Sequence, residues 1–351
     1  MPYILDLSKL ELGDIILESG TTKFSGLIKF GTGSKYSHAM IYVGSSIIHA
    51  LTDGVYSKNP QRIIVDDEKC LKVLRAKDKL TDKSKAIITQ YARNLSGSLY
   101  NIPEAGASLL LNKAKKNAIT TDQFCSRLVS QSYLQAGISI VKNPDYCSPE
   151  DLNKSQALIE VKDCLREATQ EEVDFSETSD PIKENQRRMF DWLNKARDSF
   201  KKKGIVIQTD NDVQTALMSH PDLDDEICSY IKSSEYLEHF SYDKVVNPHR
   251  YDLDLFLKKS QETGLGIELF FGEINKEPNE ITRHSTSLFQ SGLNSTHLGL
   301  EYHRLHTELY KNLLSMSKDR LTTLLQFAQL IQQRKLVQIC EYQLDYIAKI
   351  I

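Results

Sequence analysis

Three side chains in the first part of the sequence have the types and the order that thiol catalysis needs. His38 and His49 are the only histidines before residue 200, and Cys125 follows them along the chain. A thiolate attacks acyl carbonyls, and an imidazole can take up the thiol proton and return it to a leaving group. If the fold brings Cys125 to one imidazole, the other can orient that imidazole by a hydrogen bond.

The two histidines lie at the ends of an expected β-hairpin. Two apolar runs flank Gly44 and Ser45 in the segment HAMIYVGSSIIHA, which is the pattern of two strands joined by a tight turn. Folding back at this turn brings the start of the first strand near the end of the second, so the two imidazoles can approach each other. Strand alternation places His38, Met40 and Tyr42 on one face.

Cys125 lies near the start of a helix predicted over Asp122–Ala136, with Thr121 or Asp122 as its cap. The first turn of a helix has free N–H groups and the positive end of the helix dipole, which favour a thiolate and can also stabilise an oxyanion. We therefore expect a pKa for Cys125 below that of an ordinary thiol. On spacing alone, a buried core thiol and two structural histidines remain the alternative.

Short strands and helices alternate through the first half of the chain. The expected strands are Asp14–Glu18, Ser37–Val43, Ser46–Ala50, Arg62–Asp66 and Leu71–Arg75. The expected helices are Lys23–Phe30, Lys83–Leu95, Pro103–Lys116 and Asp122–Ala136, and Ser148 followed by Pro149 marks a further helix start.

The composition changes between Glu167 and Asp180, where six acids occur without a Lys or Arg. Such a segment is typical of a solvated linker. Beyond it the apolar spacing is helical, over Ile182–Lys203, Asp222–Phe240, Tyr251–Gly264 and from about Ser295 to Ile350. We therefore predict an N-terminal domain at residues 1–165, which contains His38, His49 and Cys125, an acidic linker at 166–181 and an all-helical domain of unknown role at 182–351.

Six short segments occur in an order that resembles a known enzyme family. They are LGDIIL from Leu12, YSHAMIYVG from Tyr36, IIHA from Ile47, GSLYN from Gly97, FCSRLVSQSY from Phe124 and CSPEDL from Cys147. Together they resemble the circularly permuted papain-fold hydrolases, the YiiX-like branch of the NlpC superfamily, which is related to the lecithin retinol acyltransferase-like enzymes. In these proteins the histidine strand precedes the cysteine helix, as it does here.

The resemblance implies an α+β permuted papain-like domain with Cys125 as the nucleophile and His38 as the general base. His49 matches the third polar position, where many YiiX-like members carry an acid and the acyltransferase-like branch often carries a second histidine. The implied activity is that of a cysteine hydrolase or acyltransferase, which forms an acyl-enzyme from an amide, ester or thioester bond. The expected substrate is a small peptide, an amide or a lipid acyl group, and no cofactor is implied.

Composition excludes several other classes. Lys and Arg total 44 against 47 Asp and Glu, so the chain has no overall basic field for nucleic acid. No apolar run approaches the length of a membrane-spanning helix, and the N-terminus lacks a basic and then apolar leader, which favours a cytoplasmic protein. The six cysteines have no CxxC pair and no zinc-like spacing, so we predict no disulfide framework and no zinc motif built from cysteine pairs.

Two further hypotheses remain open. The papain-like domain can be a non-catalytic platform whose helical C-terminal domain binds a protein or membrane partner. The segment Lys183–Lys203 holds eight Lys or Arg residues with Met189, Phe190, Trp192 and Leu193 among them, a composition found on membrane surfaces as well as on solvated helices that cover a core. The other hypothesis is a zinc site built from His38, His49 and Cys125.

Overall fold

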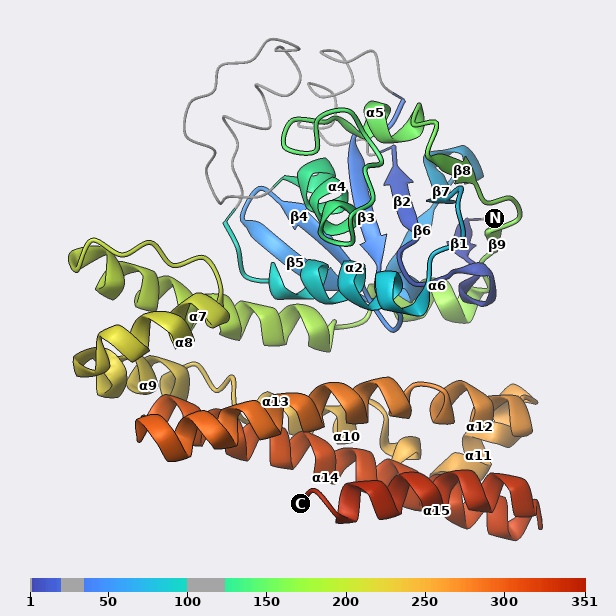
Figure 1. The fold of residues 1–351 in the computed structure, drawn as a ribbon. Helices are drawn as coiled ribbons and strands as arrows, with labels where there is room; N and C mark the ends of the chain where they lie inside the picture. The colour runs from blue at the N-terminus through green and yellow to red at the C-terminus, as the bar shows by residue number, and fades with distance from the viewer. Residues whose placement is uncertain (1, 20–34, 100–123) are drawn as a thin grey trace. The chain divides into compact units, whose positions relative to one another are not determined.

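The computed structural model describes residues 2–19, 35–99 and 124–351 (Figure 1). The described chain forms two compact units: unit 1 comprises Met1–Leu193 with Val206–Asp212, and unit 2 comprises Asn194–Ile205 with Val213–Ile351. The helices expected over Lys23–Phe30 and Pro103–Lys116 lie outside the described residues.

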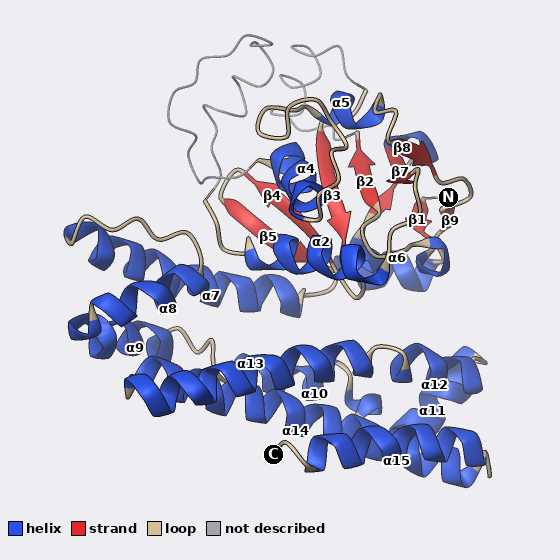
Figure 2. Ribbon diagram, viewed as in Figure 1, coloured by secondary structure: helices blue, strands red, loops and turns tan. Residues whose placement is uncertain are grey.

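Unit 1 is built on two antiparallel sheets (Figure 2). The six-stranded sheet has the order β5 (Gly54–Lys58), β4 (Ile47–Leu51), β3 (His38–Tyr42), β2 (Ile15–Glu18), β7 (Leu71–Ala76) and β8 (Leu158–Glu160). The three-stranded sheet has the order β6 (Ile64–Val65), β1 (Tyr3–Leu5) and β9 (Leu165–Glu167). The five predicted strands are confirmed, within two residues at each end.

The two faces of the larger sheet bury different sets of side chains, as strand alternation requires. On one face Ala39 and Ile41 pack with residues of α2 (Asp82–Asn94) and α4 (Cys125–Gln135), and Figure 1 shows both helices over this face. On the other face Met40 packs in a second core with residues of the three-stranded sheet, including Leu5. Cys125, the first residue of α4, is part of the first of these two cores.

The β3–β4 hairpin forms where the sequence predicts it. Gly44 has a φ of +107°, a conformation that residues with a side chain rarely adopt, and Val43 N–H donates to Ser46 C=O at 2.9 Å. The hairpin therefore fixes the register that pairs Met40 with His49.

Further helices follow α4. They are α5 (Pro149–Asn153), α6 (Gln170–Glu177), α7 (Pro181–Lys202), α8 (Asp210–Ser219), α9 (Asp224–Ser233), α10 (Asp243–Val246), α11 (Leu253–Thr263), α12 (Ile267–Ile274), α13 (Glu277–Leu298), α14 (Glu301–Leu330) and α15 (Arg334–Ala348). A permuted papain-like domain is thus followed by a helical C-terminal region, and the predicted fold class is confirmed. The predicted cap Ser148 starts α5 as part of a capping box.

The segment expected as an acidic linker, residues 166–181, contains most of β9 and all of α6. Arg62 of unit 1 donates to Thr178 C=O at 2.7 Å and lies over the ring of Phe175 at 4.4 Å. The segment is therefore attached to the surface of unit 1 along its length. The domain boundaries at 165 and 182 stay a prediction.

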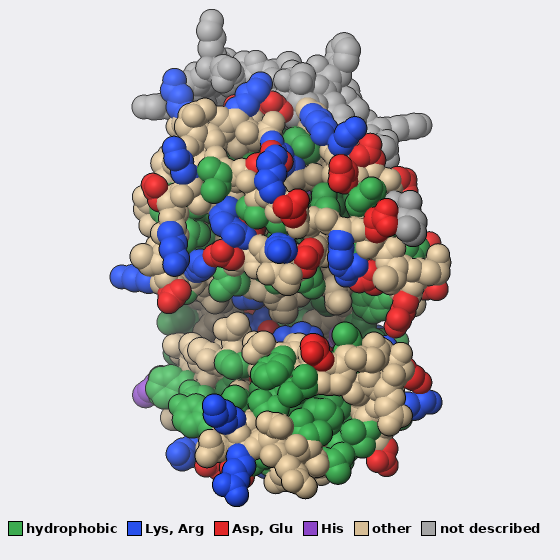
Figure 3. Space-filling model, turned by 90° about the vertical axis from the view of Figure 1, so that its right-hand side faces the viewer, with side chains coloured by type: hydrophobic (Ala, Val, Ile, Leu, Met, Phe, Trp, Pro, Cys, Tyr) green, Lys and Arg blue, Asp and Glu red, His purple; other side chains and the backbone are tan. Residues whose placement is uncertain are grey.

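The helices of unit 2 surround a core that is rich in phenylalanine. Phe327 of α14 contacts the rings of Phe256 in α11 and Phe270 in α12, at centroid distances of 5.0 and 6.0 Å. Unit 2 also exposes large hydrophobic side chains, among them Phe271 and Leu330, and Figure 3 shows hydrophobic side chains gathered on one side of these helices. Among the described residues, no helix has the length and the apolar character needed to cross a membrane.

The basic helix of the membrane hypothesis is α7, in which three of the four named apolar side chains are buried and Met189 is half-buried. Phe190 has 7% of its surface exposed, and Trp192 and Leu193 are fully buried. The burial of these three side chains fits a solvated helix that covers a protein core.

Candidate functional site

The two early histidines meet on one face of the sheet. His38 opens β3, and His49 in β4 lies directly opposite Met40, so all three residues share the face that alternation predicts. His38 Nε2 lies 3.1 Å from His49 Nδ1, and the two rings are arranged edge to face with centroids 5.3 Å apart. The prediction that the hairpin brings these imidazoles together is confirmed.

Both imidazoles are neutral at neutral pH. Burial lowers the pKa of His38 to about 4, and the nearby Lys58 ammonium acts in the same direction. Burial, followed by the neighbouring His38 and Lys58, holds the pKa of His49 well below its usual range. Since a neutral imidazole has one donor and one acceptor nitrogen, one ring donates to the other in this pair.

Cys125 is the first residue of α4 and so lies in its first turn, as predicted. The helix starts later than predicted: its N-cap residue is Phe124, whose side chain makes no capping hydrogen bond, so the prediction of Thr121 or Asp122 as the cap is wrong. Those two residues lie outside the described residues. The expected lowering of the thiol pKa is wrong. Burial raises the pKa of Cys125, and hydrogen bonds from the backbone N–H groups of Ala39 and Ser126 offset this only in part.

The bond from Ala39 places the sulfur at an opening between two strands. Tyr42 N–H donates to Asp14 C=O on the β2 side, so alternation turns the N–H of Ala39 toward β4. The pairing of β3 with β4 ends at Met40 and His49, while β4 stays paired with β5 as far as Leu51. The Ala39 N–H therefore points to where β3 and β4 separate, and there it meets the Cys125 thiol.

The structure thus brings the thiol to the backbone N–H of Ala39, on the face of the sheet that α4 covers, whereas the side chains of His38 and His49 start from the Met40 face. Within the described residues, the hydrogen bonds of the thiol are to Ala39, Ser126 and its own backbone, and neither imidazole is bonded to it. The Ala39 N–H is a functional candidate that the sequence analysis missed, because a backbone group leaves no signal in residue types.

Buried hydrogen bonds hold the first turns of α4 in place. Ser126 donates to Cys147 C=O at 2.5 Å, and Tyr133 donates to Gly13 C=O at 2.7 Å. Arg127 is fully buried, donates from Nε to Asp145 C=O at 3.1 Å and lies against the rings of Phe124 and Tyr146. Polar side chains with partners of this kind fix a helix rigidly, so the position of Cys125 is well defined.

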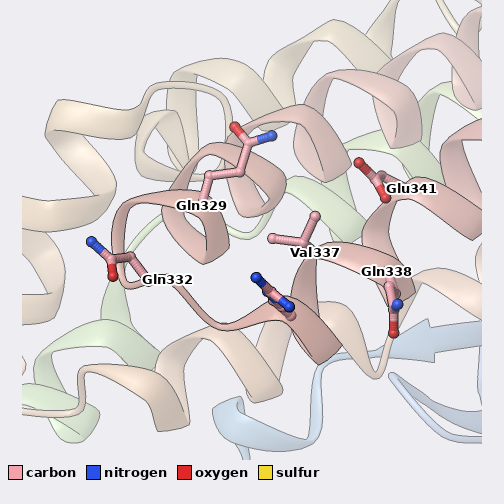
Figure 4. Close-up of a pocket in the computed structure, with 6 residues that line it drawn as sticks. Gln329, Gln332, Val337, Gln338 and Glu341 are labelled. Atoms are coloured by element: carbon pink, nitrogen blue, oxygen red, sulfur yellow. The ribbon is translucent and has the colours of Figure 1, made fainter.

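Two surface hollows of the described residues lie away from these side chains. Figure 4 shows one of about 580 Å³ at the turn between α14 and α15, where Val337 lies among amide and charged side chains; its lining residues are Gln329, Gln332, Arg334, Val337, Gln338 and Glu341. The other lies beside α2 and includes Tyr91 and Gln135. Neither includes Cys125, His38 or His49. No cluster of three or more His, Cys, Asp or Glu suited to a metal occurs within residues 2–19, 35–99 and 124–351.

Comparison with known proteins identifies the domain that carries this site. Residues 9–175 match the family described as "permuted papain-like amidase enzyme, YaeF/YiiX, C92 family". These residues include the histidine hairpin and the later cysteine helix. Residues 9–175 form a permuted papain-like domain of this family. The family resemblance predicted from the six ordered segments is confirmed, and the roles of Cys125, His38 and His49 within the domain stay predictions.

One solved structure similar to this chain is titled "Crystal structure of metalloprotein yiiX from Escherichia coli O157:H7". It is 18% identical, the match covers 44% of this chain and 97% of that chain, and the TM-score is 0.34. No curated protein matches the chain.

Proposed function

We propose that this protein is a cysteine-dependent amidase in which Cys125 is the nucleophile, His38 the general base and His49 the residue that orients His38. One observation carries the proposal. In a domain of the papain-like amidase family, the thiol that opens α4 is hydrogen-bonded to the N–H of the residue next to His38, and His38 is hydrogen-bonded to a second imidazole.

The contact between the imidazoles defines which nitrogen can act as the base. If His38 donates from Nε2 to His49 Nδ1, its own Nδ1 has a free lone pair that can take up the thiol proton. In the opposite arrangement His49 donates, and Nδ1 of His38 carries a proton and cannot act as a base. The proposal therefore requires the first arrangement, in which His49 keeps its proton on Nε2.

The reaction begins from a neutral thiol and a neutral imidazole, because burial raises the pKa of Cys125 and lowers that of His38. The thiol lies where β3 and β4 separate, and the proposal requires Nδ1 of His38 to reach the sulfur through that gap. As the S–C bond forms, Nδ1 of His38 takes the thiol proton and the carbonyl electron pair moves onto oxygen. When the intermediate collapses, the C–N bond breaks and the imidazolium gives its proton to the leaving amine. Water then attacks the thioester with His38 as base, and the acid and the thiol are released.

The N–H groups of Ala39 and Ser126 have a defined part in this sequence. Both donate to the sulfur of Cys125, and hydrogen bonds to a charged acceptor are about twice as strong as those to a neutral one. They therefore stabilise the sulfur most when it carries negative charge, which occurs as it leaves during hydrolysis of the thioester. Burial keeps the Cys125 thiol protonated in the resting enzyme, and these two hydrogen bonds stabilise the thiolate that forms briefly during the reaction.

Turnover of acyl anilides by cysteine variants tests the proposal. We expect Cys125→Ala and Cys125→Ser to lose activity by at least about a thousandfold, a loss typical of removing a nucleophile. Cys70→Ala is the matched control, because Cys70 is the half-buried thiol whereas the other five cysteines are buried. Full turnover by Cys125→Ala would contradict the proposal.

The same assay separates hydrolysis from acyl transfer. Ester and thioester substrates, including lipid acyl esters, are offered together with an amine or alcohol acceptor. An amidase releases the free acid from the amide, whereas an acyltransferase gives the acceptor adduct as its main product. If no acyl substrate is turned over while the helical region still binds a protein or vesicle, the platform hypothesis replaces the enzyme.

A further inference from the structure

His49 lies between two neighbouring strands, and its partner on β5 is Tyr56. In the antiparallel pairing of β4 with β5, His49 faces Tyr56, while in the pairing with β3 it faces Met40. Directly opposed residues have their Cβ atoms about 5 Å apart on the same face of a sheet. His49 is therefore placed between Met40 and Tyr56, and its ring can keep its direction toward His38 only if these neighbours are held in place.

Tyr56 is itself supported by α7. Its ring stacks on that of Phe190 with centroids 4.7 Å apart and an angle of 24° between the planes. Phe190 comes this close because residue 54 has no side chain: a Cβ at Gly54 would lie 2.6 Å from Phe190 Cζ and 2.8 Å from Ser98 C=O. Gly54 also has a φ of +145°, which disfavours any other residue.

A second contact attaches α7 to the same strand. Among the strands that the structure describes, β5 is the edge of the six-stranded sheet and has a neighbouring strand on one side only. The Gln186 amide lies on the other side at Ser57, where it accepts from the N–H at 3.1 Å and donates to the C=O at 2.7 Å. The buried Gln186 amide thus makes the two hydrogen bonds to β5 that a neighbouring strand would make at Ser57.

We infer that Tyr56 and Phe190 are positioning residues for the His49–His38 pair, so that α7, which begins at Pro181 beyond the residues matched to the amidase family, is part of the catalytic unit. The inference rests on the proposed function. Phe190 acts through Tyr56, and Tyr56 acts through His49, whose hydrogen bond sets the tautomer and the direction of His38. Loss of the Phe190 ring frees Tyr56 and His49 and admits water to the pair.

The test compares two phenylalanines of α7 in the full-length protein. Phe190→Ala removes the ring that stacks on Tyr56, and Phe200→Ala removes a ring that is fully buried ten positions later, in the part of α7 that belongs to unit 2. Phe190→Tyr keeps an aromatic ring and is the conservative variant. The readouts are kcat, KM and the acid limb of kcat/KM for an acyl anilide, together with the pKa of His38 from its NMR titration.

We expect Phe190→Ala to lower kcat by on the order of tenfold with little change in KM, because a misplaced base slows the chemical step. We also expect the pKa of His38 to rise from about 4 toward 6.5, since admitted water removes the cost of burial. Phe190→Tyr restores both values, and Phe200→Ala leaves the pKa of His38 unchanged even where it lowers stability.

Equal effects of Phe190→Ala and Phe200→Ala on kcat and on the pKa of His38 would overturn the inference, and so would an unchanged pKa and kcat in Phe190→Ala. The NMR titration needs no turnover. If the wild-type protein hydrolyses no amide but the pKa of His38 still shifts in Phe190→Ala and not in Phe200→Ala, the positioning is supported while the proposed function fails.

Discussion

Substitution of His49 by asparagine, aspartate or leucine separates the effects of its hydrogen-bond acceptor, its lack of charge and its volume on His38. The Oδ1 atom of Asn or Asp is the same number of bonds from Cα as the Nδ1 atom of His, which lies 3.1 Å from His38 Nε2. His49→Asn therefore keeps a neutral acceptor, His49→Asp adds a negative charge at the same place, and His49→Leu removes the acceptor at similar volume.

The charge in His49→Asp has a large calculated effect. Two unit charges about 4 Å apart in an effective dielectric of about 20 attract each other by about 4 kcal/mol, which equals about 3 pKa units. The pKa of His38 should thus rise from about 4 to about 7 in His49→Asp. In His49→Asn it should stay near its original value, and in His49→Leu kcat should fall because the tautomer of His38 is no longer fixed.

The pKa of His38 is measured from the Hε1 resonance of its ring, assigned by its loss in His38→Gln. The acid limb of kcat/KM should move with the same values, since a protonated His38 cannot act as the base. A pKa of His38 that stays near 4 in His49→Asp would refute the hydrogen-bonded arrangement from which these values are worked.

Three further predictions follow from the same contacts. Because burial raises the pKa of Cys125, its alkylation by iodoacetamide, followed by mass spectrometry, should accelerate about tenfold per pH unit up to pH 9; a plateau already reached at pH 6 would contradict this. In the folded protein His38 stays neutral down to about pH 4, whereas in the unfolded chain it is protonated near pH 6.5, so the free energy of unfolding falls as the pH falls between these values. Denaturant titration should show wild type losing about 2 kcal/mol more than His38→Gln from pH 7 to pH 5. Equal losses in the two proteins would contradict a lowered pKa of His38. Tyr133→Phe should lower the free energy of unfolding by about 1–2 kcal/mol, because the buried C=O of Gly13 loses its donor, and unchanged denaturation would show that this bond adds nothing.

The part of the site that could be predicted is the part that local sequence determines. An apolar alternation around Gly44 specifies a hairpin, and the hairpin places His38 and His49 at its paired ends without reference to the rest of the chain. A helix with Cys125 in its first turn was also predicted from local signals, although α4 begins at Cys125 and the predicted helix began at Asp122. The papain-like fold and its permuted order came from six segments in sequence order, and the family match confirms them.

The parts that could not be predicted depend on distant contacts. The pKa of Cys125 was expected to be lowered by the helix start, but burial by the sheet has the larger effect, and burial is a tertiary property. Ser57 and Gln186 are 129 positions apart, and neither residue type indicates that a side-chain amide will bond to the backbone of an edge strand. The short strands β1, β8 and β9 were missed for a similar reason, since three residues carry too little pattern.

Covalent labelling tests the central claim most directly. A vinyl sulfone probe built on an amide substrate is incubated with the full-length protein, and the modified thiol is located by peptide mass mapping. We predict one equivalent of probe on Cys125, slowed by competing substrate and abolished in His38→Ala, with the half-buried Cys70 labelled only slowly and without competition. Modification of other cysteines while Cys125 stays unmodified up to pH 9 would contradict the claim that this thiol is the nucleophile.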